Sequence, residues 1–299
     1  MIKEAYLVRF YLPEAGVRIG IQMDNVIHDV TESVHSISSL LINSVGRVQS
    51  FWDQLFDMSQ SMKTISVNDL NNPPHSQFPH WLAPVDSQDV WASGVTYERS
   101  REARQEEAVD GGDVYARVYS AKRPELFFKA RGERVVGHLD NVGIRRDSAW
   151  NVPEPELALV INPAMEIVGL TIGNDMSSRS IEGENPLYLP QAKVYDASCA
   201  LGPGILPWHD NKWPSVTITV EIERDQQVVF KDSIATERIH RSMEDLVDYL
   251  GRSHKHPDGV ILLTGTGVVP PLDFSLKADD KISITVTSIG TLTNIVQVV

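Results

Sequence analysis

Two short apolar runs, Pro153-Glu-Pro-Glu-Leu-Ala-Leu-Val160 and Ile167-Val-Gly-Leu-Thr-Ile-Gly-Asn-Asp175, occupy the middle of the chain. Asn162-Pro163 lies between them and is typical of a turn, so the segment predicts an antiparallel β-hairpin. Side chains two positions apart on a strand point to the same face, so we expect Glu154 and Glu156 to lie side by side. If Asn162 pairs with Ile167, counting outward places Asp175 opposite Glu154. The hairpin then brings three carboxylates together at one end.

Three carboxylates within a few ångströms repel one another strongly unless something neutralises them. A hard divalent cation would do so, because such ions prefer oxygen ligands. The spacing also fits a solvated strand entry at Glu-Pro-Glu with Asp175 capping a turn, and spacing alone leaves both interpretations open.

The composition indicates an ordinary globular chain of 299 residues, enough for one large domain or one with a small companion. The 40 acidic residues exceed the 27 basic ones, which argues against a nucleic-acid partner. No apolar run is long enough for a membrane helix, so we expect no membrane association. Cys199 is the single cysteine. It excludes an intrachain disulfide, fits a reducing cytoplasm, and is expected to be a packed, inert thiol.

The first 80 residues predict a small domain. Residues 1–30 alternate in the manner of antiparallel strands, and residues 33–62 show helical apolar spacing. A polar, proline-rich stretch over 71–79 then marks the approach to a boundary. We therefore divide the chain into a small N-terminal unit, 1–80, with an antiparallel sheet and helices, and a larger unit, 81–299.

The larger unit reads mostly as strands, which makes the fold class α+β with β predominant. Its charged segment 97–108 is typical of a solvated helix, and it could also form a lid. Residues 123–129 read as a strand. Lys193 follows in an unusually apolar neighbourhood, where burial near carboxylates would set its charge, although a snorkelling surface lysine fits as well.

Several motifs together resemble the fumarylacetoacetate hydrolase superfamily over roughly residues 84–299. They occur in this order: Glu154-Pro-Glu-Leu-Ala, Gly173-Asn-Asp-Met-Ser-Ser-Arg179, Gln191-Ala-Lys193, Leu201-Gly-Pro203, Thr264-Gly-Thr266 and Ile289-Gly-Thr-Leu-Thr-Asn294. The resemblance implies a mixed β-roll catalytic domain and a site for Mg²⁺, Mn²⁺ or Ca²⁺. By the same resemblance Glu154, Glu156 and Asp175 hold the ion, Lys193 lies near the substrate, and the chain forms a homo-oligomer, a dimer or a tetramer.

One segment departs from the superfamily pattern. Hydrolases of this group commonly carry a histidine and a glutamate that activate water. In this chain Ser100 stands at the histidine position and Ala103 at the glutamate position. Neither side chain serves as a general base near neutral pH without a partner. The segment therefore argues against hydrolysis by an activated water.

Further motifs resemble a branch of the superfamily that removes water from 2-keto-3-deoxy sugar acids. They are Trp91–Glu98, Arg123–Lys129, Glu184–Lys193 and His256–Val260. The likeness implies metal-dependent dehydration of 2-keto-3-deoxy-D-arabinonate or -xylonate to 2,5-dioxopentanoate through a metal-stabilised enolate. It also implies that Glu125 and Lys193 face the reacting carbons. Which of the two is the base and which the acid stays open.

Ser93, Tyr97 and Thr266 are candidate substrate contacts, because each hydroxyl lies near a glycine at the end of an apolar run. A turn cap or a satisfied core hydroxyl explains each of them equally well. Two other functions stay open for the chain. One is a C–C hydrolase or decarboxylase of acylpyruvate-like diketo acids, and the other is a non-catalytic binding module that kept the fold.

Overall fold

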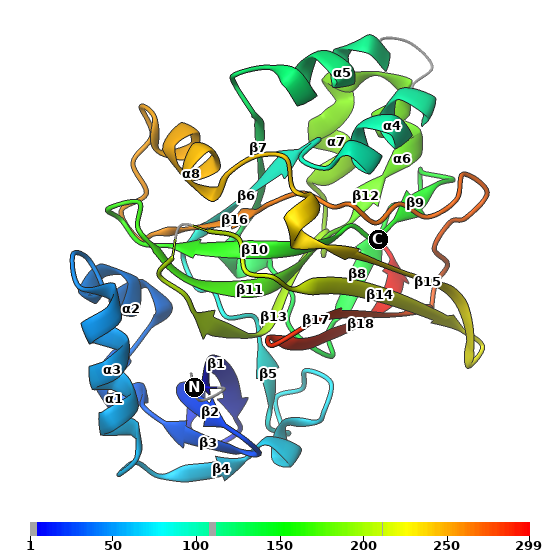
Figure 1. Ribbon diagram of the computed structural model, residues 1–299. Helices are drawn as coiled ribbons and strands as arrows, with labels where there is room; N and C mark the ends of the chain where they lie inside the picture. The colour runs from blue at the N-terminus through cyan, green and yellow to red at the C-terminus, as the bar shows by residue number, and fades with distance from the viewer. Residues whose placement is uncertain (1–4, 108–111, 211) are drawn as a thin grey trace.

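The N-terminal strands form one end of a large sheet in the computed structural model, which describes residues 5–107, 112–210 and 212–299 (Figure 1). Glycine and Asp-Asn turns connect strands whose apolar residues alternate with polar ones. These strands are β1 (Ala5–Leu12), β2 (Gly16–Met23), β3 (Val26–Asp29) and β4 (Thr64–Ser66). The helices that follow the first three are α1 (Thr31–Val34), α2 (Ile37–Asn43) and α3 (Val48–Ser59), and a 3₁₀ turn, η1 (Val67–Leu70), follows β4.

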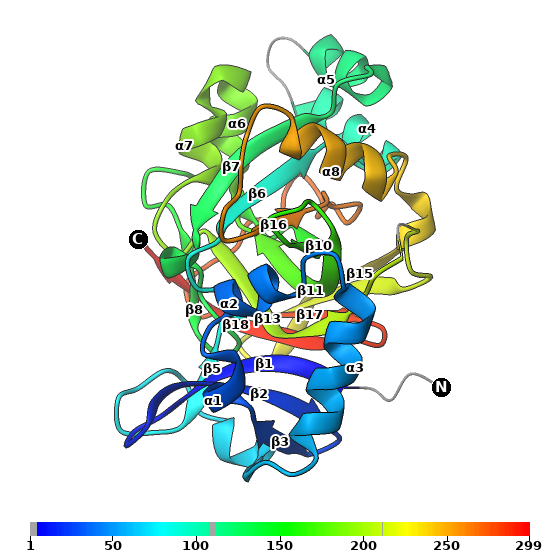
Figure 2. The ribbon, with the colours of Figure 1, turned by 90° about the vertical axis from the view of Figure 1, so that its left-hand side faces the viewer.

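This sheet continues without a break into the larger unit. Its 11 strands include the order β4-β3-β2-β1-β13-β11-β10-β16-β6-β7, with β5 also paired to β1. Figure 2 shows the N-terminal strands below the others. The strands of the larger unit are β6 (Asp89–Gly94), β7 (Glu125–Arg131), β10 (Pro155–Ile161), β11 (Ile167–Asp175), β13 (Cys199–Pro207) and β16 (Val260–Leu263). The predicted division at 80/81 falls within β5 (His80–Leu82), and it stays a prediction.

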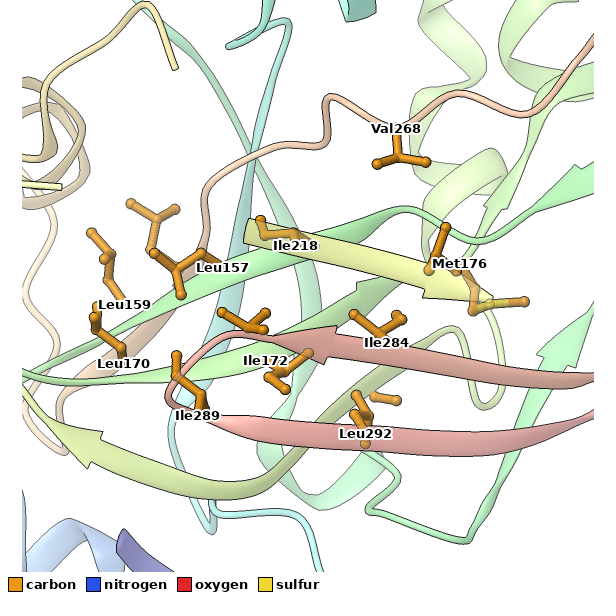
Figure 3. Close-up of a cluster of buried hydrophobic side chains, with 14 of the residues drawn as sticks. Leu157, Leu159, Leu170, Ile172, Met176, Ile218, Val268, Ile284, Ile289 and Leu292 are labelled. Atoms are coloured by element: carbon orange, nitrogen blue, oxygen red, sulfur yellow. The ribbon is translucent and has the colours of Figure 1, made fainter. Parts of the chain in front are cut away.

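A second sheet packs against β10 and β11. Its order is β15-β14-β17-β18-β8. The strands are β8 (Asn141–Ile144), β14 (Thr217–Arg224), β15 (Gln227–Ala235), β17 (Lys281–Val286) and β18 (Gly290–Val298). Figure 3 shows Leu157 and Ile172 of the first sheet facing Ile218, Ile284 and Leu292 of the second. Helix α8 (Met243–Gly251) adds its apolar face to the same core.

The opposite face of the large sheet packs on the N-terminal helices. Leu41 and Trp52 share a core with Val160, Ile261 and Leu263. The Trp52 indole Nε1–H also donates to the Val168 carbonyl oxygen at 2.9 Å. The N-terminal unit therefore contributes to the core behind the hairpin.

Short helices gather beyond the ends of β6 and β7 (Figure 1). They are α4 (Glu98–Glu107), α5 (Gly112–Ser120), α6 (Arg179–Glu184) and α7 (Leu189–Lys193). Two short strands, β9 (Asn151–Val152) and β12 (Ser177–Ser178), pair nearby, and further 3₁₀ turns are η2 (Gly132–Arg134), η3 (Pro186–Tyr188) and η4 (Thr236–Arg238). The charged segment 97–108 is helical as predicted through Glu107, and Ala108 lies outside the described residues.

The predicted hairpin is present, with one correction next to its turn. Ile161, and not Asn162, pairs with Ile167, while the Asn162 side chain accepts from turn amides. A register shift then adds one residue to β11, so Pro155 pairs with Asn174. The bulge restores the register that the simple count assumes. The mostly β, α+β class is confirmed. Among the described residues, no helix has the length and apolarity needed to cross a membrane.

Candidate active site

The hairpin brings its three carboxylates together in the interior. Glu154, Glu156 and Asp175 are all buried, and one oxygen from each lies within 4.8 Å of the others. The Asp175 amide donates to the Glu154 carbonyl oxygen at 3.0 Å, which fixes the two residues opposite each other. The structure therefore places the three predicted metal ligands in one cluster.

Three buried cations surround this cluster. Lys193 Nζ lies 2.9 Å from Glu154 Oε1, 3.1 Å from Asp175 Oδ2 and 2.6 Å from Ser177 Oγ. Arg179 Nη2 lies 3.2 Å from Glu154 Oε1. Lys129 forms an ion pair with Asp175 Oδ1. Each carboxylate oxygen named here therefore has a cationic partner.

Glu156 is the carboxylate with the least cationic support. Its Oε2 accepts the backbone N–H of Gly265. Burial, and then the charges of Asp175 and Glu154, raise its pKa well above the ordinary value. A negative charge on Glu156 is therefore costly unless a cation arrives.

The donor set fits a hard divalent cation. All three candidate ligands supply carboxylate oxygen, which Mg²⁺ and Ca²⁺ prefer. Counting the neighbouring Glu125 and Glu182, the site holds more carboxylates than its cations Lys129, Arg179 and Lys193 neutralise. A divalent ion would supply the missing positive charge.

A narrow cavity opens beside the carboxylates. Its wall includes Glu154, Asp175 and the two residues predicted to face the reacting carbons, Glu125 and Lys193. Glu125 pairs with Gly94 at the β6–β7 edge, and a methyl group at Gly94 would collide with the Glu125 carboxylate. Glycine at position 94 therefore gives Glu125 its place in the cavity.

The predicted substrate contacts divide into two groups. Ser93 and Thr266 line the cavity. The Ser93 hydroxyl has no hydrogen-bond partner among the described residues, whereas Thr266 Oγ1 accepts the Val268 amide at 3.2 Å. Tyr97 lies deeper, at 1% exposure, and burial and the nearby Glu156 charge raise the pKa of its phenol.

The departure from the hydrolase pattern also lies at this cavity. Ser100 is buried and lines the wall. Ala103 lies one turn further along α4. Position 100 therefore lines the cavity with a hydroxyl in place of an imidazole.

Sequence reasoning missed three site residues, Lys129, Arg179 and Glu182. Arg179 Nη1 lies 3.4 Å from Glu182 Oε2, and both side chains are buried. Lys129 and Arg179 each close a motif that the resemblance uses. Each lies at the C-terminal end of its motif, Arg123–Lys129 or Gly173–Arg179, and this position does not indicate that the side chain points into the interior.

The mixed β-roll with buried carboxylates at the end of its central hairpin defines a class of protein, and the chain belongs to the fumarylacetoacetate hydrolase family. Residues 89–297 match the family model described as "Fumarylacetoacetate (FAA) hydrolase C-terminal". This confirms the resemblance drawn from the motifs.

Three relatives narrow the comparison. The chain is 48% identical over 221 residues, 74% of its length and 76% of the relative's, to a "Probable 2-keto-3-deoxyxylonate dehydratase" of Haloferax volcanii. It is 43% identical over 240 residues, 79% of its length and 78% of the relative's, to the 2-dehydro-3-deoxy-D-arabinonate dehydratase of Saccharolobus solfataricus. A solved 2-keto-3-deoxy-D-arabinonate dehydratase, complexed with magnesium and 2,5-dioxopentanoate, superposes with a TM-score of 0.80 at 34% identity, covering 98% of this chain and 99% of that one.

Proposed function

We propose that this protein is a magnesium-dependent hydro-lyase that converts a 2-keto-3-deoxypentonate into 2,5-dioxopentanoate. The observation that carries the proposal is the composition of the cavity wall. Glu125 and Lys193 border the same space as the carboxylate cluster, and Ser100 occupies the position of the hydrolytic histidine. The names of the two dehydratase relatives, each matched over about three quarters of both chains, agree with it.

Glu154, Glu156 and Asp175 would hold the cation. When bound, Mg²⁺ supplies Lewis-acid polarisation of a 2-keto acid, which makes the protons at C3 more acidic. Mn²⁺ or Ca²⁺ would suit the same oxygen ligands, with Ca²⁺ the less demanding in geometry. Burial strengthens the electrostatic interactions of all three side chains.

Glu125 and Lys193 would move the protons. One takes a proton from C3, and the other donates a proton to the C4 hydroxyl, which leaves as water. A proton shift from C5 to C3 then gives an enol across C4 and C5, and this enol tautomerises to the aldehyde. Lys193 Nζ already has three oxygen acceptors, including the Ser177 hydroxyl, and the residue lines the cavity. Ser93 and Thr266 would bind substrate hydroxyl groups, and Tyr97 would support this wall from behind.

The chief alternative is a C–C hydrolase or decarboxylase of an acylpyruvate-like diketo acid. It would use the same cation with a different base. Ser100 argues against the hydrolase, because a serine without a basic partner does not activate water.

We also propose that the protein acts in the cytoplasm as a homo-oligomer, a dimer or a tetramer. The resemblance to the family supports the assembly. Cys199, the single cysteine, is buried and fits a reducing compartment. Light scattering coupled to size-exclusion chromatography measures the assembly directly.

The deciding experiment offers both C4 epimers of 2-keto-3-deoxypentonate and an acylpyruvate, each with Mg²⁺ and with EDTA. A coupled semialdehyde dehydrogenase reports the aldehyde product. We expect aldehyde from a pentonate with Mg²⁺ alone, and loss of turnover in Glu125→Gln and Lys193→Met. Consumption of the acylpyruvate without any aldehyde from either epimer would reverse the assignment. Cation binding without turnover of any 2-keto acid would support a binding module.

A further inference from the structure

Lys129 is a charged side chain that the proposed chemistry does not use. It is fully buried, at 0% exposure. Its ammonium group pairs with Asp175 Oδ1 and donates to two carbonyl oxygens, that of Met176 at 2.9 Å and that of Lys193 at 2.5 Å. The ammonium group therefore has three oxygen neighbours, two of which accept hydrogen bonds and one of which is an ion-pair partner.

The contacts of Lys129 join two parts of the site that lie apart in the chain. Asp175 ends β11 and contributes to the carboxylate cluster. Lys193 is the last residue of α7 and lines the cavity. The ammonium group therefore connects the end of the hairpin directly to the helix end that carries Lys193.

The local backbone is built around this residue. Val90 pairs with Ala130, but Trp91 pairs with Phe128, so Lys129 is the extra, unpaired residue of a β-bulge in β7. Bulges redirect side chains and are common beside active sites. Earlier in the same strand, Glu125 and Phe127 line the cavity. Lys129 is therefore the one residue in this part of β7 that has no pairing partner in β6.

We propose that Lys129 is a positioning residue that sets the places of the Asp175 carboxylate and of Lys193 relative to each other. It does not touch the substrate, because it is fully buried and, unlike Lys193, is not among the described residues that line the cavity. The catalytic part of this inference rests on the proposed function, whereas its cation-binding part stands without it.

The affinity for a divalent cation distinguishes a positioning role of Lys129 from a purely electrostatic one. A lysine beside a cation site repels the cation, so removing a mere charge would tighten binding. Removing a positioning residue would weaken binding instead, because Asp175 loses the group that fixes its oxygen. Groups that orient metal ligands in this way typically contribute 10–100-fold to affinity.

The test compares Lys129→Met with the native protein and with Lys281→Met. The control removes a half-exposed lysine of β17 whose partner is Glu223, away from the site. Calorimetry with Mn²⁺ alone measures cation binding without substrate, and kcat and KM are then measured at saturating Mn²⁺. For Lys129→Met we expect about tenfold or greater weakening of Mn²⁺ binding. We also expect kcat to stay roughly tenfold or more below native at saturation, because Lys193 is misplaced. Lys281→Met should match the native protein in both.

Native or tighter Mn²⁺ binding by a folded Lys129→Met overturns the inference. If this variant does not fold, Lys129→Arg decides, since it keeps the charge but moves the donors outward. Weaker Mn²⁺ binding by the folded arginine variant supports positioning, and native binding contradicts it. Failure of both variants to fold assigns Lys129 to stability and also overturns the inference. If the native protein binds Mn²⁺ but dehydrates no pentonate, the proposed function fails while the affinity comparison still stands.

Discussion

The charge of Glu156 has opposite effects on cation binding, which it favours, and on the stability of the fold without a cation, which it lowers. Its carboxylate is buried between Asp175 and Glu154, and both the burial and these charges raise its pKa. Glutamine keeps the shape and can still accept the Gly265 N–H, but it removes the charge. Glu156→Gln should therefore weaken Mg²⁺ or Mn²⁺ binding about 100-fold or more, while the melting temperature in EDTA stays level or rises. Calorimetry and thermal denaturation measure the two effects. A variant that binds the cation normally would remove Glu156 from the ligand set.

His138 should make stability depend on pH. Its Nδ1 accepts the Thr293 amide at 3.0 Å, and burial lowers its pKa from 6.5 to about 4. The unfolded chain therefore takes up this proton first as the pH falls. The free energy of unfolding should drop between about pH 6.5 and pH 4, by on the order of 3 kcal/mol from this residue. Urea unfolding at several pH values should show a shallower decline for His138→Gln. Parallel declines for the two proteins would contradict the assignment.

At the residue scale, the sequence predicts the carboxylates better than their partners. Glu154, Glu156 and Asp175 follow from strand alternation and a hairpin count, which are local rules. Lys129 and Arg179 approach the cluster from other elements, so no local spacing reveals them. The hairpin count predicts the wrong pair at the turn, Asn162 with Ile167. It still places Asp175 opposite Glu154, because the bulge in β11 shifts the register by one residue.

At the scale of elements, the pairing of β6 with β7 determines where Glu125 lies in the cavity. A methyl group at Gly94 would meet the Glu125 carboxylate, which lies at the far end of a flexible side chain. Gly94→Ala should therefore cost little stability, within about 1 kcal/mol, but should lower kcat about tenfold or more by displacing Glu125. Denaturation and steady-state kinetics measure the two quantities.

The matched control for Gly94→Ala is Gly251→Ala at the end of α8, where the added methyl meets the Met165 side chain. It should leave kcat unchanged. If both alanine variants keep native kcat, Glu125 does not depend on the space at position 94.

The elements themselves are mostly predictable, and their junctions are not. Alternating apolar residues indicate the N-terminal strands, and the charged segment after Tyr97 indicates α4. Tertiary contacts decide what the periodicity cannot, such as the bulge at Lys129 and the short helices α6 and α7. The buried residues of these helices include the site residues Arg179, Glu182 and Lys193.

For the whole molecule, the N-terminal unit is part of the structural support of the site. β1 pairs with β13, and Leu7 and Trp52 share a core with Leu201 and Ile261. A fragment of residues 81–299 would expose the edge of β13 and this apolar face to water. We expect the fragment to aggregate or to lack cooperative unfolding, as circular dichroism and light scattering would show. A soluble fragment with native Mn²⁺ affinity would instead support two independent domains.

The short turn of the central hairpin has a consequence for how the chain folds. β10 and β11 are neighbours in sequence, so their contacts have a small sequence separation, and we expect them to form early. Like charges therefore meet early, before β16 and β6 cover them and before Lys193 is delivered by the following segment. We therefore expect the electrostatic work of building the site to fall on an early folding event, where a bound cation or proton would lower the cost of bringing the carboxylates together.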